Sequence, residues 1–278
     1  MTQKRSWKGY WKRTGDNIRS HPLLAVVYLV LRLMVMAGVV LNVLEKDYES
    51  AFVCGLVLVL FLLPAFLERS LRIDIPSVME VVILLFIFAA EILGELQSYY
   101  LQYPYWDTML HTVNGFLCAA FGFSLVDILN RNNREKFRLS PLYVALVAFC
   151  FSMTVGVVWE FFEFGMDVVF LTDMQKDTVL NTVSTVELTG GLTVLRDITT
   201  VMVNGKELGV GGYLDIGLYD TMADLFVNFV GALVFSVFGY VYIRRRGKGK
   251  SGRLMRHFLP TLTGDLDETT TDDPSAES

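Results

Sequence analysis

The chain has 278 residues, of which 53% are hydrophobic and 19% are charged, and its mean hydropathy is +0.45. A soluble globular domain of this length is less apolar, so the composition excludes an ordinary soluble fold and predicts membrane spans. The formal net charge of −5 identifies no partner, because most basic residues flank the apolar runs and many acids lie in one loop and in the tail. We expect no nucleic-acid partner.

Residues 1–22 form a basic lead segment that is followed by an apolar run. This run is longer than the core of a signal peptide, and no small-x-small cleavage motif follows it, so we expect a retained helix. Six runs in the chain are each long enough to cross about 30 Å of hydrocarbon, where only a helix satisfies the backbone of a single segment. They cover residues 23–44, 50–67, 76–96, 105–129, 141–170 and 216–243.

Lysine and arginine residues concentrate before the first run, between the second and third, between the fourth and fifth, and after the sixth. With six helices and both termini in the cytoplasm, every loop obeys the positive-inside rule, whereas five or seven helices would break it. The sequence therefore predicts an all-α, multi-pass protein of the inner cell membrane. Its membrane domain spans residues 23–243 and has about six transmembrane helices.

Two further segments are predicted to lie outside the bilayer. Residues 171–215 form an outer-face loop insertion, in which the β-rich piece 192–203 and the following Asn204-Gly205 predict a hairpin. Residues 244–278 change from basic to acidic and threonine-rich with few apolar side chains. This composition predicts a disordered cytoplasmic tail.

Closely spaced ionisable residues occur inside four of the six runs, although each costs at least about 2.5 kcal/mol at the bilayer centre. Within each run they are spaced three or four residues apart, which places them on one helix face. They are Glu91 and Glu95 in the third run, Asp107 and His111 in the fourth, Glu160, Glu163 and Asp167 in the fifth, and Asp220 and Asp224 in the sixth.

The predicted topology places these groups at a common depth. At about 1.5 Å per residue, His111, Glu163, Asp224 and Glu91 all lie roughly 10 Å below the outer boundary. Most of the others lie one turn shallower, and Glu160 lies one turn deeper. Because the helices run in opposite directions, a shared level is unexpected for scattered acids and predicts a single site.

Carboxylates gathered in a poorly hydrated place must hold protons or share cations. Asp and Glu oxygens with one imidazole suit a divalent Mg, Mn, Fe or Zn ion. The predicted ligands are Asp107, His111, Glu160, Glu163, Asp220 and Asp224. A possible additional site comprises Glu91, Glu95, Asp167 and Arg32.

Simpler explanations stay open for several of these residues. Helix-end solvation or N-terminal capping accounts equally well for the shallow acids, which are Asp107, Asp220, Asp167 and Glu95. Arg32 is either a counter-ion for Glu160 or a side chain that snorkels to the interface. A protonated, hydrogen-bonded structural core is the alternative for the deeper group.

Three segments resemble the YjdF-like bacterial inner-membrane proteins. They are Trp-Asp-Thr-Met-Leu-His at 106–111, Trp-Glu-Phe-Phe-Glu at 159–163 and Tyr-Asp-Thr-Met-Ala-Asp at 219–224, within a matched region of about 106–233. The resemblance implies that the same six predicted ligands form a set, but it implies no reaction. The loop 171–215 is longer than is usual in that family, so a shared outer-face function does not follow.

Two functional classes fit these observations best. In the first, a metal site facing the outer leaflet activates water or oxygen against a lipid or another small membrane-soluble substrate. In the second, the same groups serve a cation or proton-coupled transporter. The concentration of acids near one face favours the first class, because a transporter also needs polar groups in the inner halves of the helices. A structural or partner-binding membrane subunit is a third possibility.

Overall fold

The computed structural model describes residues 22–71, 73–132, 139–245 and 258–262. Six of its helical segments are long and apolar enough to cross a membrane, which confirms the predicted all-α membrane fold. The segments are 25–45, 48–71, 77–96, 106–129, 141–170 and 218–244. Almost all of the basic segment 1–22 lies outside the described residues.

The chain divides into two compact units. Unit one comprises residues 1–153 and 228–278, and unit two comprises residues 154–227. Two long helices contribute to both units, namely α8 (Pro141–Phe170) and α9 (Leu218–Arg244). Each unit is described by itself below.

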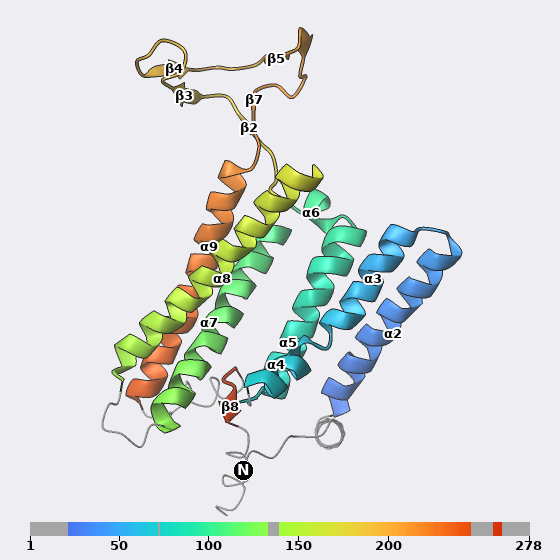
Figure 1. The fold of residues 1–278 in the computed structure, drawn as a ribbon, viewed down its shortest axis with the longest axis vertical. Coiled ribbons are helices and arrows are strands. Elements are labelled where there is room, and N and C mark those ends of the chain that lie inside the picture. Colours follow the sequence, from blue (N-terminus) through green and yellow to red (C-terminus); the bar gives the residue numbers. More distant parts are fainter. Residues whose placement is uncertain (1–21, 72, 133–138, 246–257, 263–278) are drawn as a thin grey trace, which may run out of the picture. The chain divides into compact units, whose positions relative to one another are not determined.

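Unit one begins with helices that pack through small and branched apolar side chains. Helix α2 (Pro22–Leu44) lies beside α3 (Tyr48–Leu60), and α4 (Leu63–Leu71) follows (Figure 1). Asp47 caps α3 by accepting a hydrogen bond from the amide of Ser50 at 3.1 Å. This bond lowers the pKa of the Asp47 carboxyl, which lies between two spans. The second predicted span is thus broken into α3 and α4 just before Pro64.

The third span changes its helical geometry midway. It begins as α5 (Ser77–Ile87) and continues as the π-helix η1 (Phe88–Leu96), after which the short α6 (Tyr99–Gln102) leads to α7 (Trp106–Asn132). Gly94 makes room for the next turn of chain, because a Cβ atom there would lie 2.4 Å from the ring of Tyr100. The glycine therefore lets α6 fold back onto η1.

Helices α7 and α9 cross in backbone contact within unit one. A Cβ atom on Gly115 would lie 2.2 Å from the carbonyl oxygen of Asn228, and one on Gly231 would lie 2.1 Å from that of Thr112. Small residues permit this close approach in membrane helices, where tight packing replaces the hydrophobic driving force. The crossing fixes the register of α7 against the unit-one part of α9.

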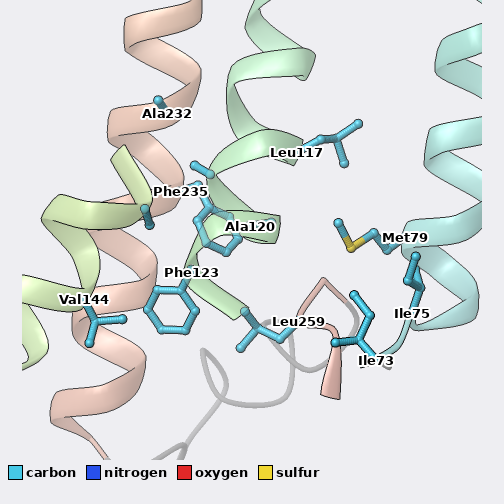
Figure 2. Close-up of a cluster of buried hydrophobic side chains, with 12 residues drawn as sticks. Ile73, Ile75, Met79, Leu117, Ala120, Phe123, Val144, Ala232, Phe235 and Leu259 are labelled. Carbon is cyan, nitrogen blue, oxygen red and sulfur yellow. The ribbon is translucent and has the colours of Figure 1, made fainter. Parts of the chain in front are cut away.

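An aromatic core continues along α7 from this crossing (Figure 2). Phe123 and Phe235 are fully buried, with ring centroids 5.9 Å apart, and Phe116 packs edge-on against Phe235 at 5.0 Å. The buried Ala119, Ala120 and Ala232 fill the space between the rings, so this half of the helix pair is densely packed and apolar.

Part of the C-terminal tail belongs to this core, which departs from the disorder predicted for residues 244–278. Strand β8 (Thr261–Leu262) pairs antiparallel with β1 (Ile73–Asp74). Leu259 is 6% exposed and packs in the same cluster as Ile73, Met79 and Phe123 (Figure 2). Phe258 packs against the same cluster. The rest of the tail beyond residue 245 lies outside the described residues.

Unit two consists of the end of α8, a loop with three small two-stranded sheets, and the start of α9 (Figure 1). Strand β2 pairs with β7, β3 with β4, and β5 with β6, all antiparallel. Their bounds are β2 Thr178–Leu180, β3 Val183–Thr185, β4 Thr193–Leu195, β5 Met202–Val203, β6 Lys206–Glu207 and β7 Tyr213–Asp215.

The predicted hairpin is correct in its turn but not in its extent. Asn204 and Gly205 have φ angles of 52° and 78°, as a two-residue hairpin turn requires, and they join β5 to β6. The β-rich piece 192–203 is not one strand, because β4 and β5 within it pair with different partners. β4 and β5 belong to two separate hairpins, which the β-rich composition of this piece does not distinguish.

Candidate functional site

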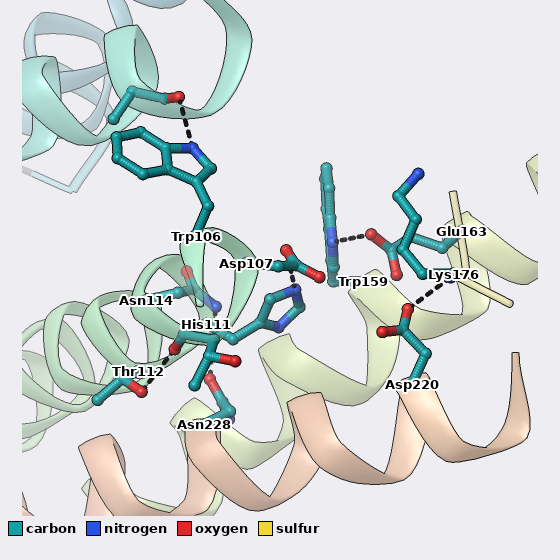
Figure 3. Close-up of polar contacts among 12 residues, drawn as sticks. Trp106, Asp107, His111, Thr112, Asn114, Trp159, Glu163, Lys176, Asp220 and Asn228 are labelled. Carbon is teal, nitrogen blue, oxygen red and sulfur yellow. Dashed lines mark hydrogen bonds and ion pairs between the residues drawn. The ribbon is translucent and has the colours of Figure 1, made fainter. Parts of the chain in front are cut away.

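Two ionisable side chains share one face near the start of α7. Asp107 lies in the first turn and His111 follows one turn later. The Nε2 atom of His111 lies 3.5 Å from Oδ1 of Asp107, and the imidazole is buried while the carboxylate is partly exposed (Figure 3). A carboxylate beside an imidazole orients the ring and selects its tautomer, as in many metal sites. The pair is a candidate Asp/His site.

Trp106 anchors the start of α7. Its Nε1 atom donates to the carbonyl oxygen of Ala89 at 3.3 Å (Figure 3). Ala89 belongs to η1, and π-helical turns occur mostly at functional sites. The rings of Tyr99 and Tyr103 pack against Trp106, with centroids 4.9 and 6.5 Å away. Asp107 therefore follows a fixed aromatic anchor and does not sit at a loose helix end.

The two acids of the third span lie on η1. Glu91 is half-buried and Glu95 is exposed. Among the described residues, neither belongs to a group of three or more His, Cys, Asp or Glu side chains that could hold an ion. Their role in an additional site stays a prediction.

A layer of amides lies one turn further along α7 and α9 in unit one. Asn228 is fully buried, and its Oδ1 atom accepts a hydrogen bond from Nδ2 of Asn114 at 3.5 Å. The remaining contacts are to sulfur: Asn228 donates to Sδ of Met153 at 3.6 Å, and Sγ of Cys118 donates to Asn114 at 3.4 Å. Buried amides in a membrane need partners, and these are long or weak. The layer is polar but is not tightly hydrogen-bonded.

Unit two contains deeply buried carboxylates. The Nε1 atom of Trp159 donates to Oε1 of Glu163 at 2.8 Å, one turn along α8 (Figure 3). Glu163 and Glu160 are 7% and 4% exposed, and Asp224 on α9 is 3% exposed. Burial of carboxylates is costly unless they are paired, protonated or hydrogen-bonded, so intramembrane acids of this kind mark function by default.

Asp167 and Asp220 hold the loop that follows α8. The Asp167 carboxylate accepts hydrogen bonds from the amides of Met174 and Gln175 at 2.7 and 2.8 Å, and from the hydroxyl of Thr172 at 2.7 Å. Oδ2 of Asp220 accepts from the amide of Lys176 at 2.7 Å (Figure 3). These bonds support the helix-end explanation for both acids, while a ligand role for Asp220 stays a prediction.

The loop next to these helix ends is strongly acidic. The pKa of Asp177 is raised, first by its partial burial and then by the negative charges of Asp173 and Asp215. Lys176 opposes this effect with its own charge. The balance leaves a negative potential at this end of unit two, which attracts cations.

Comparison with known proteins identifies the family. A family described as predicted membrane protein (DUF2238) matches residues 26–245, which is most of the chain. The chain belongs to this family. The YjdF-like resemblance seen in the three sequence segments is thereby confirmed. No curated protein and no solved structure matches the chain.

Within unit one, Asp107 and His111 supply two candidate ligands for a metal ion. A carboxylate and an imidazole suit a divalent ion of intermediate hardness, such as Mn, Fe or Zn, and leave coordination positions for other ligands. The ligand roles of Glu160, Glu163, Asp220 and Asp224 in unit two stay predictions. Metal binding itself stays a hypothesis.

Arg32 has a partner on its own helix. Its guanidinium carbon lies 5.3 Å from the ring centroid of Tyr28, an arrangement that stabilises a cation in an apolar setting. The proposed pairing with Glu160 stays a prediction.

Sequence reasoning passed over Glu80 and Lys176. Glu80 is a half-buried acid in the first turn of α5, and the rule applied to the other intramembrane acids would have found it. Lys176 carries no sequence signal, because its position depends on Asp220, which lies far along the chain.

Proposed function

We propose that this protein binds a divalent metal ion through Asp107 and His111, and acts there on a lipid or another small membrane-soluble substrate. The observation that carries the proposal is a carboxylate beside a buried imidazole inside an apolar span. Solvated surface acids need no such explanation, but an ionisable pair in a membrane helix does.

The chemistry follows from the types of side chain. A divalent ion bound to these groups would act as a Lewis acid and lower the pKa of a bound water. Asp107 would keep the His111 imidazole neutral and correctly oriented for binding.

Orientation belongs to the same proposal. The positive-inside rule supports cytoplasmic termini and a site that faces the outer leaflet. A reporter fused after residue 248 and one inserted near residue 204 are expected on opposite sides of the membrane. If both reporters appear on one side, the outward-facing site is wrong.

The packing of unit one favours an outward-facing enzyme over a transporter. Beyond the amide layer, α7 and α9 touch through Gly115 and Gly231, and the buried rings of Phe123 and Phe235 follow. A transported cation would need charged or strongly polar groups along this half of the helix pair, and the buried polar side chains described there are the hydroxyls of Ser124 and Ser236.

Metal analysis of the purified protein tests the proposal. The parent is expected to co-purify with a divalent ion, and His111→Ala is expected to lose it. His21→Ala is the matched control, because it removes a histidine that precedes the first candidate span. If no divalent ion binds to the parent after incubation with Mn²⁺, Fe²⁺ or Zn²⁺, or if His111→Ala retains the same content, the metal site is wrong.

A further inference from the structure

A short piece of the C-terminal tail is built into the membrane domain. Residues 258–262 pack against β1 and α7, and β8 extends β1 as an antiparallel partner, with Ile73 opposite Leu262 and Asp74 opposite Thr261. Addition of a strand to an exposed edge is a common way to bind an extended peptide, because the backbone supplies affinity and alternate side chains enter pockets. Here the peptide comes from the same chain.

This segment reaches far along α7. The ring of Phe258 packs edge-on against Phe116, with centroids 5.6 Å apart. Phe116 is ten residues from the start of α7, or roughly 15 Å along the helix. The tail therefore inserts an aromatic side chain to about the middle of the span, between α5 and α7.

Strand β1 lies in the connection between the second and third candidate spans. Protein covers it there, because Ile73, Asp74 and Ile75 are all 3% exposed or less. The amide of Ile75 is satisfied by Oε1 of Glu68 at 2.8 Å. Leu259 fills the space between these residues and Phe123 (Figure 2).

We propose that residues 258–262 are a separable plug, which covers β1 and the adjoining apolar part of α7 on the side predicted to be cytoplasmic. The segment is joined to α9 only through the chain that follows Arg245, so it docks as a tethered ligand at high effective concentration. Its apolar contribution comes from very few side chains and is comparable to the entropy lost in ordering five residues. The docked and released states are therefore close in free energy.

Release of the plug exposes the buried faces of Met79 and Leu117 to the cytoplasm. Met79 is 1% exposed and lies in the same cluster as Leu259 (Figure 2). Docking of the plug requires no metal ion, so an experiment that disproves the metal site leaves the plug proposal unaffected.

Cysteine accessibility tests the plug in the full-length protein. Cys54, Cys118 and Cys150 are first replaced by alanine, and Met79→Cys is introduced as the reporter. Inside-out membrane vesicles are treated with a membrane-impermeant maleimide. With the tail intact, labelling of Met79→Cys is expected to be slow, and adding Leu259→Asp or deleting residues 258–278 should accelerate it at least tenfold. Leu266→Asp, in the same tail, is the matched control and should leave the rate unchanged.

A second reporter distinguishes release from unfolding. Val57→Cys lies in the other buried cluster of unit one and should stay unlabelled in every tail variant. A synthetic peptide of residues 257–264 should restore protection of Met79→Cys in the deletion variant. Equal labelling of Met79→Cys with and without the segment overturns the plug. Labelling of Val57→Cys in the tail variants also overturns it, because the segment would then be an inseparable part of the fold.

Discussion

Aspartate carboxylates near the ends of the spans have different partners in the two units. Asp167 and Asp220 in unit two direct their carboxylates at backbone amides of the following loop. Asp107 in unit one directs its carboxylate at the imidazole of His111. The difference lies in the neighbouring backbone. Where a loop folds back over a helix end, its amides donate to the carboxylate, and where a fixed aromatic anchor starts the helix, the carboxylate faces an imidazole instead.

The largest expected effect is the loss of stability on adding a chelator, which should depend on Asp107 but not on Asp167. At a thousandfold excess of free ion over Kd, a bound metal stabilises the parent by about 4 kcal/mol, and chelator should remove this stabilisation. Asp107→Asn is expected to lose most of the chelator response, whereas Asp167→Asn should keep it. Thermal unfolding in detergent, with and without chelator, is the measurement. An equal chelator response in the two variants would mean that the comparison between the pairs is false.

Asp167→Ala should instead loosen the loop. It removes three hydrogen bonds to a carboxylate, and the expected local loss is about 2–3 kcal/mol after partial replacement by water. Hydrogen exchange at the amides of Met174 and Gln175 reports it directly. Asp107→Ala is the control and should leave these two amides protected. Unchanged exchange in Asp167→Ala would show that the loop is held by other contacts.

The substitution Trp159→Phe tests how much the hydrogen bond between Trp159 and Glu163 contributes to the free energy of unfolding. Loss of the indole hydrogen bond at 2.8 Å should destabilise the protein by about 1.5–3 kcal/mol if the acceptor is ionised, because bonds to charged groups are stronger. In a Glu163→Gln background the same change should cost only about 1 kcal/mol. A double-mutant cycle of unfolding free energies gives the difference. If the two costs are equal, Glu163 is already neutral, which supports the protonated-core explanation.

The smallest effect is expected from the acidic loop itself. The pKa of the Asp177 carboxyl is raised in the folded protein above its ordinary value of 3.8, so ionisation of this group opposes folding. The free energy of unfolding therefore falls as the pH rises from 3.8 through the pKa of the folded state. Asp177→Asn should therefore stabilise the loop at pH 7 by less than about 0.5 kcal/mol, given solvent screening. The gain should vanish below about pH 3.8. Hydrogen exchange of the β2 and β7 amides against pH measures it, and a gain that grows on acidification would reverse the assigned sign.

The six spans, their approximate limits and the family membership could be predicted from the sequence because they depend on local composition. An apolar run of span length must be helical in a bilayer, whatever surrounds it. Spacings of three or four residues placed Asp107 and His111 on one face, and the structure brings them together as expected. The intramembrane acids were visible for the same reason, since a charge in an apolar run stands out in the sequence itself.

Only the tertiary structure decided which acids meet loop amides, where the tail docks and how the β-rich loop divides. The partners of Asp220 and Leu259 lie far away in the sequence, and no local period encodes them. Composition predicted disorder for the whole tail because it averages over polar residues. Packing of Phe258 and Leu259 and pairing of β8 with the edge of β1 order residues 258–262 despite this composition. Burial and backbone pairing depend on the surface that a segment meets, which composition does not describe.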